Sequence, residues 1–556
     1  MRWDVSGWSG LVLLALAGCA AGDAGEADVV FRGGTVWTGE AGGMRAEALA
    51  IQGARILVVG TEEEVAEVTG PETRMVELAG RTLLPGFVDS HTHFLSGGFQ
   101  LSSVDLRDAA TPEEFASRIA EFARSLQPGE WITGGDWDHE LWGGALPRKE
   151  WVDSLTPDHP VFVSRLDGHM ALANTLALKS GGVTDETADP PGGSLVRDSE
   201  GSLTGILRDN AMALVQRTVP DRSLEEWDRA LEAAAGRALS LGVTQVHDVD
   251  GWASLEVYRR AHAEGRLPLR VYAAVPVSGW ERLREFVQEE GRGDERLWWG
   301  GLKGFVDGSL GSTTAWFYEP YTDDPTTAGL LTTDTAQLRS WIEMADEAEL
   351  QAMIHAIGDQ ANDWLLDVYE GLGPRNGARD RRFRIEHAQH LTRDAIRRIA
   401  ELDVIPAMQP YHAADDGRWA ERRIGPDRIR TTYAFRSLLD AGASVALGSD
   451  WTVAPLDPLL GIDAAVTRRT IDGANPDGWV PEERISLEEA LMGYTRNAAH
   501  AGFSDSFTGT LAAGKMADLV VLSGDLFAQP VSRMSDLQVD MTWVAGEEIF
   551  RREGVR

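Results

Sequence analysis

The sequence contains little cysteine, little lysine and fewer basic than acidic residues. Cys19 is the only cysteine among 556 residues. This excludes an intrachain disulfide and leaves no other thiolate to act as a nucleophile or metal ligand. Lys and Arg number 52 and Asp and Glu 87, which gives a formal net charge of −35. Because nucleic-acid binding needs a basic surface, we expect no nucleic-acid partner and no electrostatic binding to anionic lipid.

A bilayer-spanning run is also lacking at the N-terminus, where Arg2 precedes an apolar stretch at residues 11–17. This stretch is too short for a spanning helix and is typical of a secretory signal. Residues 16–19, Leu-Ala-Gly-Cys, resemble the end of a bacterial lipoprotein signal. We therefore expect residues 1–19 to be a lipoprotein signal peptide with Cys19 lipidated. The exported protein would be held by its acyl anchor, at the periplasmic face of the outer membrane or at the cell surface. An uncleaved leader with an incidental cysteine is the alternative.

What the chain does contain is a pair of histidines ending an apolar segment. Residues 83–93 read Leu-Leu-Pro-Gly-Phe-Val-Asp-Ser-His-Thr-His. Side chains alternate faces along a strand, so His91 and His93 are expected to project together from its C-terminal end. Two neutral imidazoles at one point suit a zinc-type cation. Two half-buried polar residues at a strand end would explain the same pair, so the metal interpretation depends on the rest of the chain.

Three further strand-like segments end in His355, His387 and Asp450. The intervals between these residues are 32 and 63 residues. A (β/α)8 barrel of about 250 residues contains eight strand-and-helix repeats. The shorter interval is close to the length of one such repeat, and the longer interval is close to the length of two. Residues 404–409 supply a strand for the longer interval. The sequence therefore predicts an α/β fold, a (β/α)8 TIM-type barrel over residues 85–506, with the candidate ligands at the carboxyl ends of strands 1, 5, 6 and 8.

The spacing also predicts a large insertion after strand 1. Residues 242–247 and 269–275 are the expected strands 2 and 3, and Lys303 lies on the expected strand 4. From His93 to Lys303 is 210 residues, whereas three barrel repeats need about 100. The surplus should form an insertion at about residues 97–240, over the barrel mouth.

Both flanks of the barrel contain short strand-like segments separated by glycine turns. These segments lie within residues 27–84 and 507–556. Neither group has enough strands to form a stable core alone. We therefore expect the two flanks to pair into one small β-sandwich.

Lys303 is one of only four lysines among the 52 basic residues. A buried lysine can lose its proton, and the neutral amine can react with carbon dioxide to give a carbamate that bridges two metals. The alternative is a structural ion pair between Lys303 and Asp307 or Asp450.

A set of motifs along the chain carries a family resemblance. They are residues 85–93, 167–169, 303–309, 355–359, 385–387, 409–410, 448–450 and 514–519. Together they resemble the amidohydrolase superfamily, in the YtcJ-like branch of metal-dependent hydrolases (amidohydrolase 3 type) that includes N-substituted formamide deformylases. The likeness runs from about residue 27 to residue 550. It implies a (β/α)8 barrel that binds one or two divalent metals and hydrolyses a carbon–nitrogen bond.

The resemblance also implies a role for each candidate ligand. The implied metal ligands are His91, His93, Lys303, His355, His387 and Asp450. The strand-1 pair and Asp450 would hold the first ion, expected to be zinc, and the two later histidines a second one. Carboxylated Lys303 would bridge them. Asp450 would take a proton from the attacking water and give it to the leaving nitrogen.

The remaining polar and aromatic residues are divided between pocket, core and surface. The expected substrate-pocket residues are Asp167, His169, His412 and Trp451. The resemblance places the first two there, and Trp451 follows the candidate base directly. His247 fits either the pocket or the core, and His390 is expected to be structural. The histidines expected on the surface are His139, His159, His262 and His500.

Three functional hypotheses follow. The first is hydrolysis of a non-peptide amide bond in a small molecule. The second is another reaction at the same metal site, such as ring opening, deamination or ester hydrolysis, because one barrel can host many chemistries. The third is a surface-anchored binding or regulatory lipoprotein without catalysis. The sequence does not define an oligomeric state, and a homodimer is one option.

Overall fold

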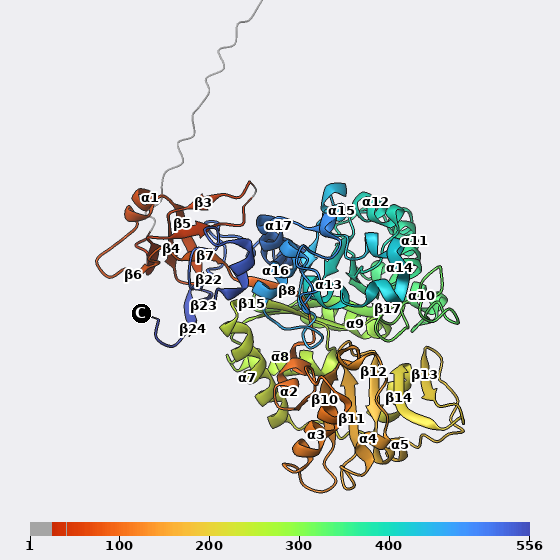
Figure 1. Ribbon diagram of the computed structural model, residues 1–556. Coiled ribbons are helices and arrows are strands. Elements are labelled where there is room, and N and C mark those ends of the chain that lie inside the picture. Colours follow the sequence, from red (N-terminus) through yellow and green to blue (C-terminus); the bar gives the residue numbers. More distant parts are fainter. Residues whose placement is uncertain (1–24, 41, 556) are drawn as a thin grey trace, which may run out of the picture.

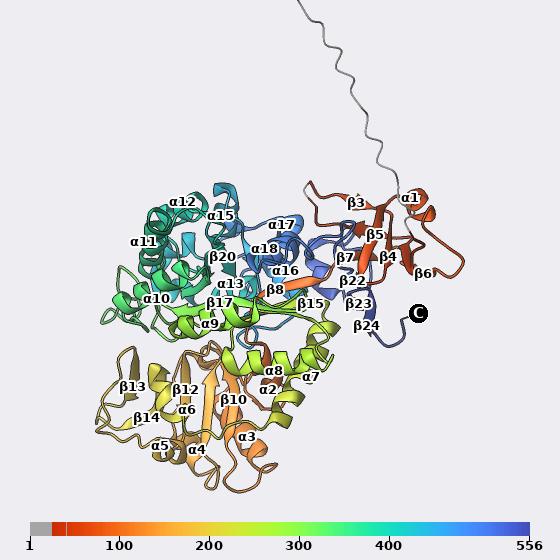
Figure 2. The same cartoon turned by 180° about the vertical axis from the view of Figure 1, so that it is seen from behind.

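The computed structural model describes residues 25–40 and 42–555, so Cys19 and the predicted signal peptide lie outside the described residues. The described chain forms a parallel barrel, a second sheet packed over one end of it, and a β-sandwich at its side (Figures 1 and 2). The barrel carries the candidate ligands, so its strand ends define the site.

Eight strands pair in parallel and follow one another in chain order. They are β8 (Phe87–Thr92), β15 (Val243–Asp248), β16 (Arg270–Pro276), β17 (Leu297–Phe305), β18 (Gln351–Ala356), β19 (Arg384–His387), β20 (Ile405–Met408) and β21 (Ala446–Leu447). The ring closes just beyond β21. There the Asp450 N–H donates to the His91 carbonyl (2.8 Å), and the His93 N–H donates to the Trp451 carbonyl (2.5 Å). The predicted (β/α)8 barrel is confirmed.

Helices connect consecutive strands and cover the outside of the barrel. They include α7 (Leu224–Ser240), α8 (Trp252–Ala263), α9 (Trp280–Glu290), α10 (Thr335–Glu347), α11 (Asp359–Asn376), α12 (Arg393–Glu401) and α15 (Phe435–Ala441). Helix α7 shows how the sequence determines where such a helix begins and which face it buries. Ser223 and Glu226 form a capping box at its start. Buried Ala and Leu residues then recur every three or four positions along one face.

The segment between β8 and α7 forms its own six-stranded sheet, in the order β13-β14-β12-β11-β10-β9. Its strands are β9 (Val104–Asp105), β10 (Ile132–Trp137), β11 (Val161–Arg165), β12 (Met170–Ala173), β13 (Gly193–Arg197) and β14 (Leu203–Asp209). The helices α3 (Pro112–Ala123), α4 (Glu150–Asp153) and α5 (Thr175–Ser180) lie within the same segment. The sheet therefore spans residues 104–209, inside the predicted range of 97–240. Helix α7, at the end of that range, contributes Leu231, Ala235 and Leu239 to the barrel core instead.

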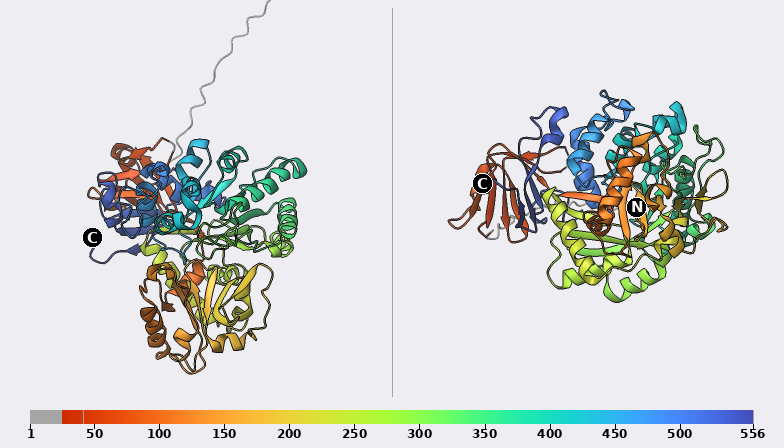
Figure 3. Two further views of the ribbon diagram at one scale, coloured as in Figure 1. Left: turned by 45° about the vertical axis from the view of Figure 1, so that its right-hand side comes forward. Right: turned by 60° about the horizontal axis from the view of Figure 1, so that its bottom comes forward.

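The two chain flanks form a β-sandwich. One sheet, ordered β5-β4-β1-β6, contains β1 (Val29–Arg32), β4 (Ala48–Gln52), β5 (Arg55–Gly60) and β6 (Arg74–Glu77). The other, ordered β24-β23-β22-β7-β2-β3, contains β2 (Thr35–Trp37), β3 (Arg45–Ala46), β7 (Thr82–Pro85), β22 (Leu519–Leu522), β23 (Val539–Val544) and β24 (Glu547–Arg551). The right-hand view of Figure 3 shows the red N-terminal and blue C-terminal strands together beside the barrel.

Within residues 25–40 and 42–555, none of the helices combines the length and the apolar character needed to cross a bilayer.

Candidate metal centre

All six candidate ligands meet at the carboxyl end of the barrel. Asp450 Oδ1 lies 3.7 Å from His91 Nε2 and 3.6 Å from His93 Nε2. The His387 ring centroid is 4.9 Å from that of His91 and 4.6 Å from that of His355. Lys303 Nζ, on β17, lies 3.3 Å from His91 Nε2. Residues more than 300 positions apart in the sequence thus surround one small volume.

Two of these residues are aimed by unusual backbone conformations. His387 has φ +76° and is followed by Ala388 at +46°, and Asp450 has φ +58°. Strict alternation along β19 would point His387 away from its neighbour Glu386 at the barrel interior. The left-handed turn brings its ring back to the centre. Such conformations cost on the order of 1–3 kcal/mol each and persist where the surrounding structure imposes them.

Each candidate histidine ligand uses one ring nitrogen to bind the protein. The four contacts are His91 Nδ1 with Glu386 Oε2, His93 Nδ1 with Asp250 Oδ1 (2.9 Å), His387 Nδ1 with Gln409 Oε1 (2.9 Å), and His355 Nε2 with the Gly308 carbonyl (3.0 Å). Every partner is an oxygen acceptor, so the bound nitrogen carries the proton. The other nitrogen of each ring keeps a lone pair for a cation, which is the usual arrangement around metal-binding histidines.

Asp450 supplies a further sign that the site fits a cation. Its Oδ1 is buried and has no hydrogen-bond partner among the described residues. Leaving a buried carboxylate oxygen unpaired is costly. Candidate ligand atoms of His91, His93 and Asp450 lie within 4.8 Å of one another, and a second such group joins His387, His412 and Asp450. The donor types and their spacing fit a divalent metal ion.

The protonation states of the histidines favour metal binding. Burial is the main cause that puts the pKa values of His91, His355 and His387 well below the usual value. These rings are therefore neutral at pH 7. Burial is also the largest single effect on His93, but the hydrogen bond to Asp250 and the negative charges of Asp250 and Asp450 together outweigh it and raise the pKa of His93.

Lys303 is buried, with 5% of its surface exposed. Burial lowers the pKa of this lysine to about 8. In the described part of the chain it forms no ion pair with a carboxylate. Asp307, one of the two partners considered, instead accepts backbone N–H groups from Ile357, Gly358 and Trp316. The amine is thus held near the histidines without a neutralising partner.

A charged network lies beneath the ligands inside the barrel. Arg384 donates to both carboxylate oxygens of Glu386 at 2.8 Å, and its third nitrogen lies 3.0 Å from His247 Nδ1. Arg384, Glu386 and His247 are fully buried. Barrel interiors are ordinarily packed with branched apolar residues. The charged residues at this position therefore indicate a role beyond packing, which is to orient the His91 ring.

We expect Glu386→Gln to weaken zinc binding by about 10- to 100-fold, because partners that orient a ligand histidine have effects of this size. It should also destabilise the fold by about 3–5 kcal/mol, since Arg384 would lose its buried counter-charge. A zinc competition titration and urea unfolding measure the two effects. Asp346→Asn is the control: Asp346 pairs with Arg379 and Arg381 away from the site, so it should lower stability and leave zinc affinity intact. Unchanged zinc affinity in Glu386→Gln would contradict the orienting role.

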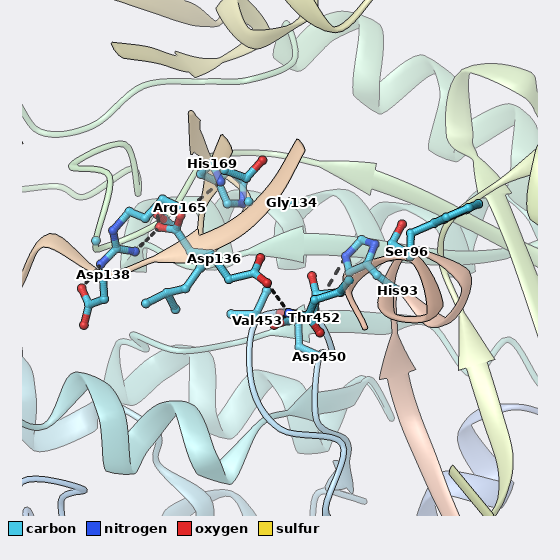
Figure 4. Close-up of a pocket in the computed structure, with 18 of the residues that line it drawn as sticks. His93, Ser96, Gly134, Asp136, Asp138, Arg165, His169, Asp450, Thr452 and Val453 are labelled. Carbon is cyan, nitrogen blue, oxygen red and sulfur yellow. Dashed lines mark hydrogen bonds and ion pairs between the residues drawn. The ribbon is translucent and has the colours of Figure 1, made fainter. Parts of the chain in front are cut away.

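A cavity of about 610 Å³ opens over the candidate ligands. Barrel and inserted sheet both line it, and it extends from His93 and Asp450 past Asp136 to Arg165 and Asp138 (Figure 4). The predicted pocket residues Asp167, His169 and His412 line this cavity. Trp451 does not. Its ring packs against Phe94, with centroids 6.1 Å apart, and lies against Gly97, and the two residues that follow it, Thr452 and Val453, line the cavity instead.

The other histidines divide differently from the prediction. His139 and His159 were expected on the surface but are only 2% and 7% exposed. His139 contacts Arg165 inside the insertion, and His159 Nδ1 contacts the Glu130 carbonyl (3.0 Å). His247 belongs to the core network, and His390 is buried with Nδ1 2.8 Å from Thr432 Oγ1.

Sequence reasoning missed the residues that hold the ligands. Glu386 and Gln409 were in the quoted motifs without an assigned role, and Asp250, just after β15, was not singled out. Asp209, at the end of β14, was also missed. It accepts from His169 Nδ1 at 2.7 Å and has φ +47°. An acid close to a strand end was the only available signal for these two aspartates.

Comparison with known proteins agrees with this geometry. The model of the Amidohydrolase family matches residues 74–550. Protein LONG AFTER FAR-RED 3 of Arabidopsis thaliana is 40% identical over 540 residues, covering 94% of this chain and 92% of the relative. The YtcJ protein of Bacillus subtilis is 33% identical over 534 residues (94% and 99%), and N-substituted formamide deformylase of Arthrobacter pascens is 30% identical over 546 residues (95% and 99%).

A solved structure supports the same assignment. The crystal structure of an uncharacterized metal-dependent hydrolase from Pyrococcus furiosus matches with a TM-score of 0.70 and 30% identity, covering 89% of this chain and 98% of the other. The family match covers most of the chain, and the site presents the donors for a divalent metal. The chain belongs to the amidohydrolase family and is a metal-dependent enzyme that hydrolyses carbon–nitrogen bonds other than peptide bonds.

Proposed function

We propose that the enzyme hydrolyses a small N-substituted amide of the formamide class, with Asp450 moving the proton. The position of Asp450 carries the proposal. Its unpartnered Oδ1 faces the strand-1 histidines, while Oδ2 lies 3.7 Å from His387 Nδ1 and 3.9 Å from His412 Nε2. One carboxylate can therefore bind a cation through one oxygen and exchange a proton through the other.

The site would hold one or two divalent cations, and we take zinc as the natural metal. The strand-1 histidines and Asp450 would hold one, and His355 and His387 the other, with the carbamate of Lys303 between them. When bound, such ions lower the pKa of water to near neutrality and polarise a carbonyl group. The carbamate forms when the neutral amine bonds to the carbon of carbon dioxide and releases a proton. A pKa of about 8 leaves a usable neutral fraction at physiological pH.

Asp450 is suited to a base-then-acid role. Burial, the largest effect, raises its pKa to about 6, although His93 and Lys303 act in the opposite direction. A base is most effective when its pKa is near the working pH. In the proposed step, the water oxygen bonds to the carbonyl carbon and its proton passes to Asp450. The same proton then goes to the nitrogen as the carbon–nitrogen bond breaks, so the products are a carboxylic acid and an amine.

The cavity favours a substrate with a bulky, partly apolar substituent on nitrogen. Its volume of about 610 Å³ is within the range of small-molecule sites. Phe99, Phe162 and Trp227 form part of its wall, and the Arg222 guanidinium stacks 4.9 Å over the Phe99 ring. The 30% identity to N-substituted formamide deformylase supports the same substrate class.

A substrate panel tests the function. Zinc-loaded enzyme would be assayed with N-benzylformamide-type compounds, N-acetyl amides, cyclic amides, aminopurines and aryl esters. We expect the N-substituted formamides to give the highest kcat/KM. If the enzyme instead prefers the aminopurines, the cyclic amides or the aryl esters, its reaction is deamination, ring opening or ester hydrolysis, and the proposed function is wrong. A metal-loaded protein that turns over none of the compounds would favour a binding or regulatory role.

Export and lipid anchoring through Cys19 remain a proposal from the leader sequence alone. Mass spectrometry of the mature N-terminus tests it, and an intact, unlipidated leader would contradict it.

A further inference from the structure

His412 faces the cavity with a buried ring nitrogen that has no partner. It lies on α13 (Pro410–Asp416), directly after β20. The residue is 8% exposed and lines the cavity. Its Nε2 has no hydrogen-bond partner among the described residues and lies 3.9 Å from Asp450 Oδ2. Because this atom also lies at the cavity wall, it can bind a group of the substrate.

The ring of His412 is fixed by its neighbours. It lies nearly parallel to the His387 ring, with an interplanar angle of 14° and centroids 6.4 Å apart. Gln389 Nε2 lies 3.5 Å from its Nδ1. The backbone carbonyl of Gln389 accepts the Tyr433 N–H at 2.7 Å, which ties that residue to the following helical segment. His412 is therefore oriented before any substrate binds.

The hydrogen-bonding polarity of His412 is opposite to that of the four candidate ligands. In each of those four rings, one nitrogen donates to an oxygen acceptor of the protein, so the nitrogen that faces the site carries a lone pair. The Nδ1 of His412 faces an amide N–H donor, and its Nε2 faces a carboxylate oxygen. Both neighbours favour the tautomer with the proton on Nε2. The ring is buried at the cavity wall and in this tautomer carries a single N–H, on Nε2.

We propose that His412 is a catalytic residue whose Nε2–H donates a hydrogen bond to the carbonyl oxygen of the substrate, more strongly as that oxygen gains negative charge. This inference rests on the proposed function. A preorganised neutral donor in a buried site stabilises developing charge without reorganisation. Its Nε2 lies beside Asp450 Oδ2, so the donor and the proton carrier can reach the same substrate group. His412 also falls in the second group of possible ligands, with His387 and Asp450, but a metal-ligand role would need a lone pair on Nε2, which this tautomer does not offer.

The experiment compares His412→Leu, which removes the donor, with His412→Gln, which can restore one. The control is His390→Leu, because His390 is also buried and also has an unpartnered Nε2 but is not among the residues that line the cavity. Zinc stoichiometry and affinity, kcat and KM on N-benzylformamide, and the affinity for the corresponding H-phosphonamidate, a tetrahedral mimic, would be measured for each.

For His412→Leu we expect unchanged zinc binding, a kcat lower by about 10²–10³-fold and little change in KM, as for loss of one oxyanion donor. Affinity for the phosphonamidate should fall by a similar factor. His412→Gln should recover part of kcat, and His390→Leu should behave as wild type.

Two results would overturn the inference alone. Loss of zinc in His412→Leu would make His412 a ligand, and retained kcat would remove its role. Failure of zinc-loaded wild-type enzyme to hydrolyse any amide would instead overturn the proposed function, and this inference with it.

Discussion

We expect Asp450→Asn to fold, to retain part of its zinc and to lose turnover by at least about 10³-fold. The amide cannot accept a proton from water or return one to nitrogen, and positioned acid–base groups contribute about 10²–10⁴-fold. Its remaining oxygen can still face the strand-1 histidines, so binding of one cation should survive in weakened form. Steady-state kinetics at a fixed zinc occupancy, checked by atomic emission, measures the effect.

Asp346→Asn serves as the control, because it also replaces a buried aspartate but lies away from the site, beside Arg379 and Arg381. It should retain wild-type kcat. Full activity in zinc-loaded Asp450→Asn would exclude the base role. Complete loss of zinc would show that Asp450 acts chiefly as a ligand.

The second large effect is expected at Lys303. We expect Lys303→Ala to lower kcat by about 100-fold or more, since removing a direct ligand should cost at least as much as removing a residue that orients one. Added acetate or propionate should restore part of the activity, because a short carboxylate can occupy the space of the missing carbamate. In the wild-type enzyme, ¹³C-labelled carbon dioxide should give a carbamate signal by NMR, and Lys303→Ala should lack it.

Lys303→Arg separates charge from chemistry, because arginine remains protonated and cannot form the carbamate. It should be as inactive as Lys303→Ala. Lys515→Ala is the matched control: Lys515 is partly buried, and its Nζ donates to the Thr508 carbonyl at 3.1 Å in the flanking region. A Lys303→Arg enzyme with normal kcat, or a wild-type enzyme without the NMR signal, would point to an ordinary amine at this position.

The barrel could be predicted because its repeat length appears directly in the spacing of polar residues at the ends of apolar segments. The expected strands 242–247 and 269–275 differ from β15 and β16 by about one residue at each end. His355, His387 and Asp450 end successive or alternate repeats, and parallel strands must bring such residues to one face. The insertion could be predicted because the interval from His93 to Lys303 is much longer than the three repeats that it should contain.

What could not be predicted depends on contacts between distant segments. The burial of His139 results from Arg165 within the inserted sheet, and no local pattern marks it. The direction of Trp451 depends on the left-handed turn at Asp450 and on the bridge between Trp451 and Thr92. These turn the ring toward Phe94. The tautomers of the ligand histidines likewise depend on which acceptor lies behind each ring.

The composite sandwich constrains when the enzyme can mature. β7 pairs with β22, so that Pro85 lies opposite Leu519, and the next strand after β7 carries His91. On one side β7 can pair with β2, which is made before it, but its other side stays unpaired until β22 and nearly all of the polypeptide have been made. Contacts of such long range form slowly. Metal loading is therefore expected late in biogenesis, and truncation before β22 should yield a product that proteases remove.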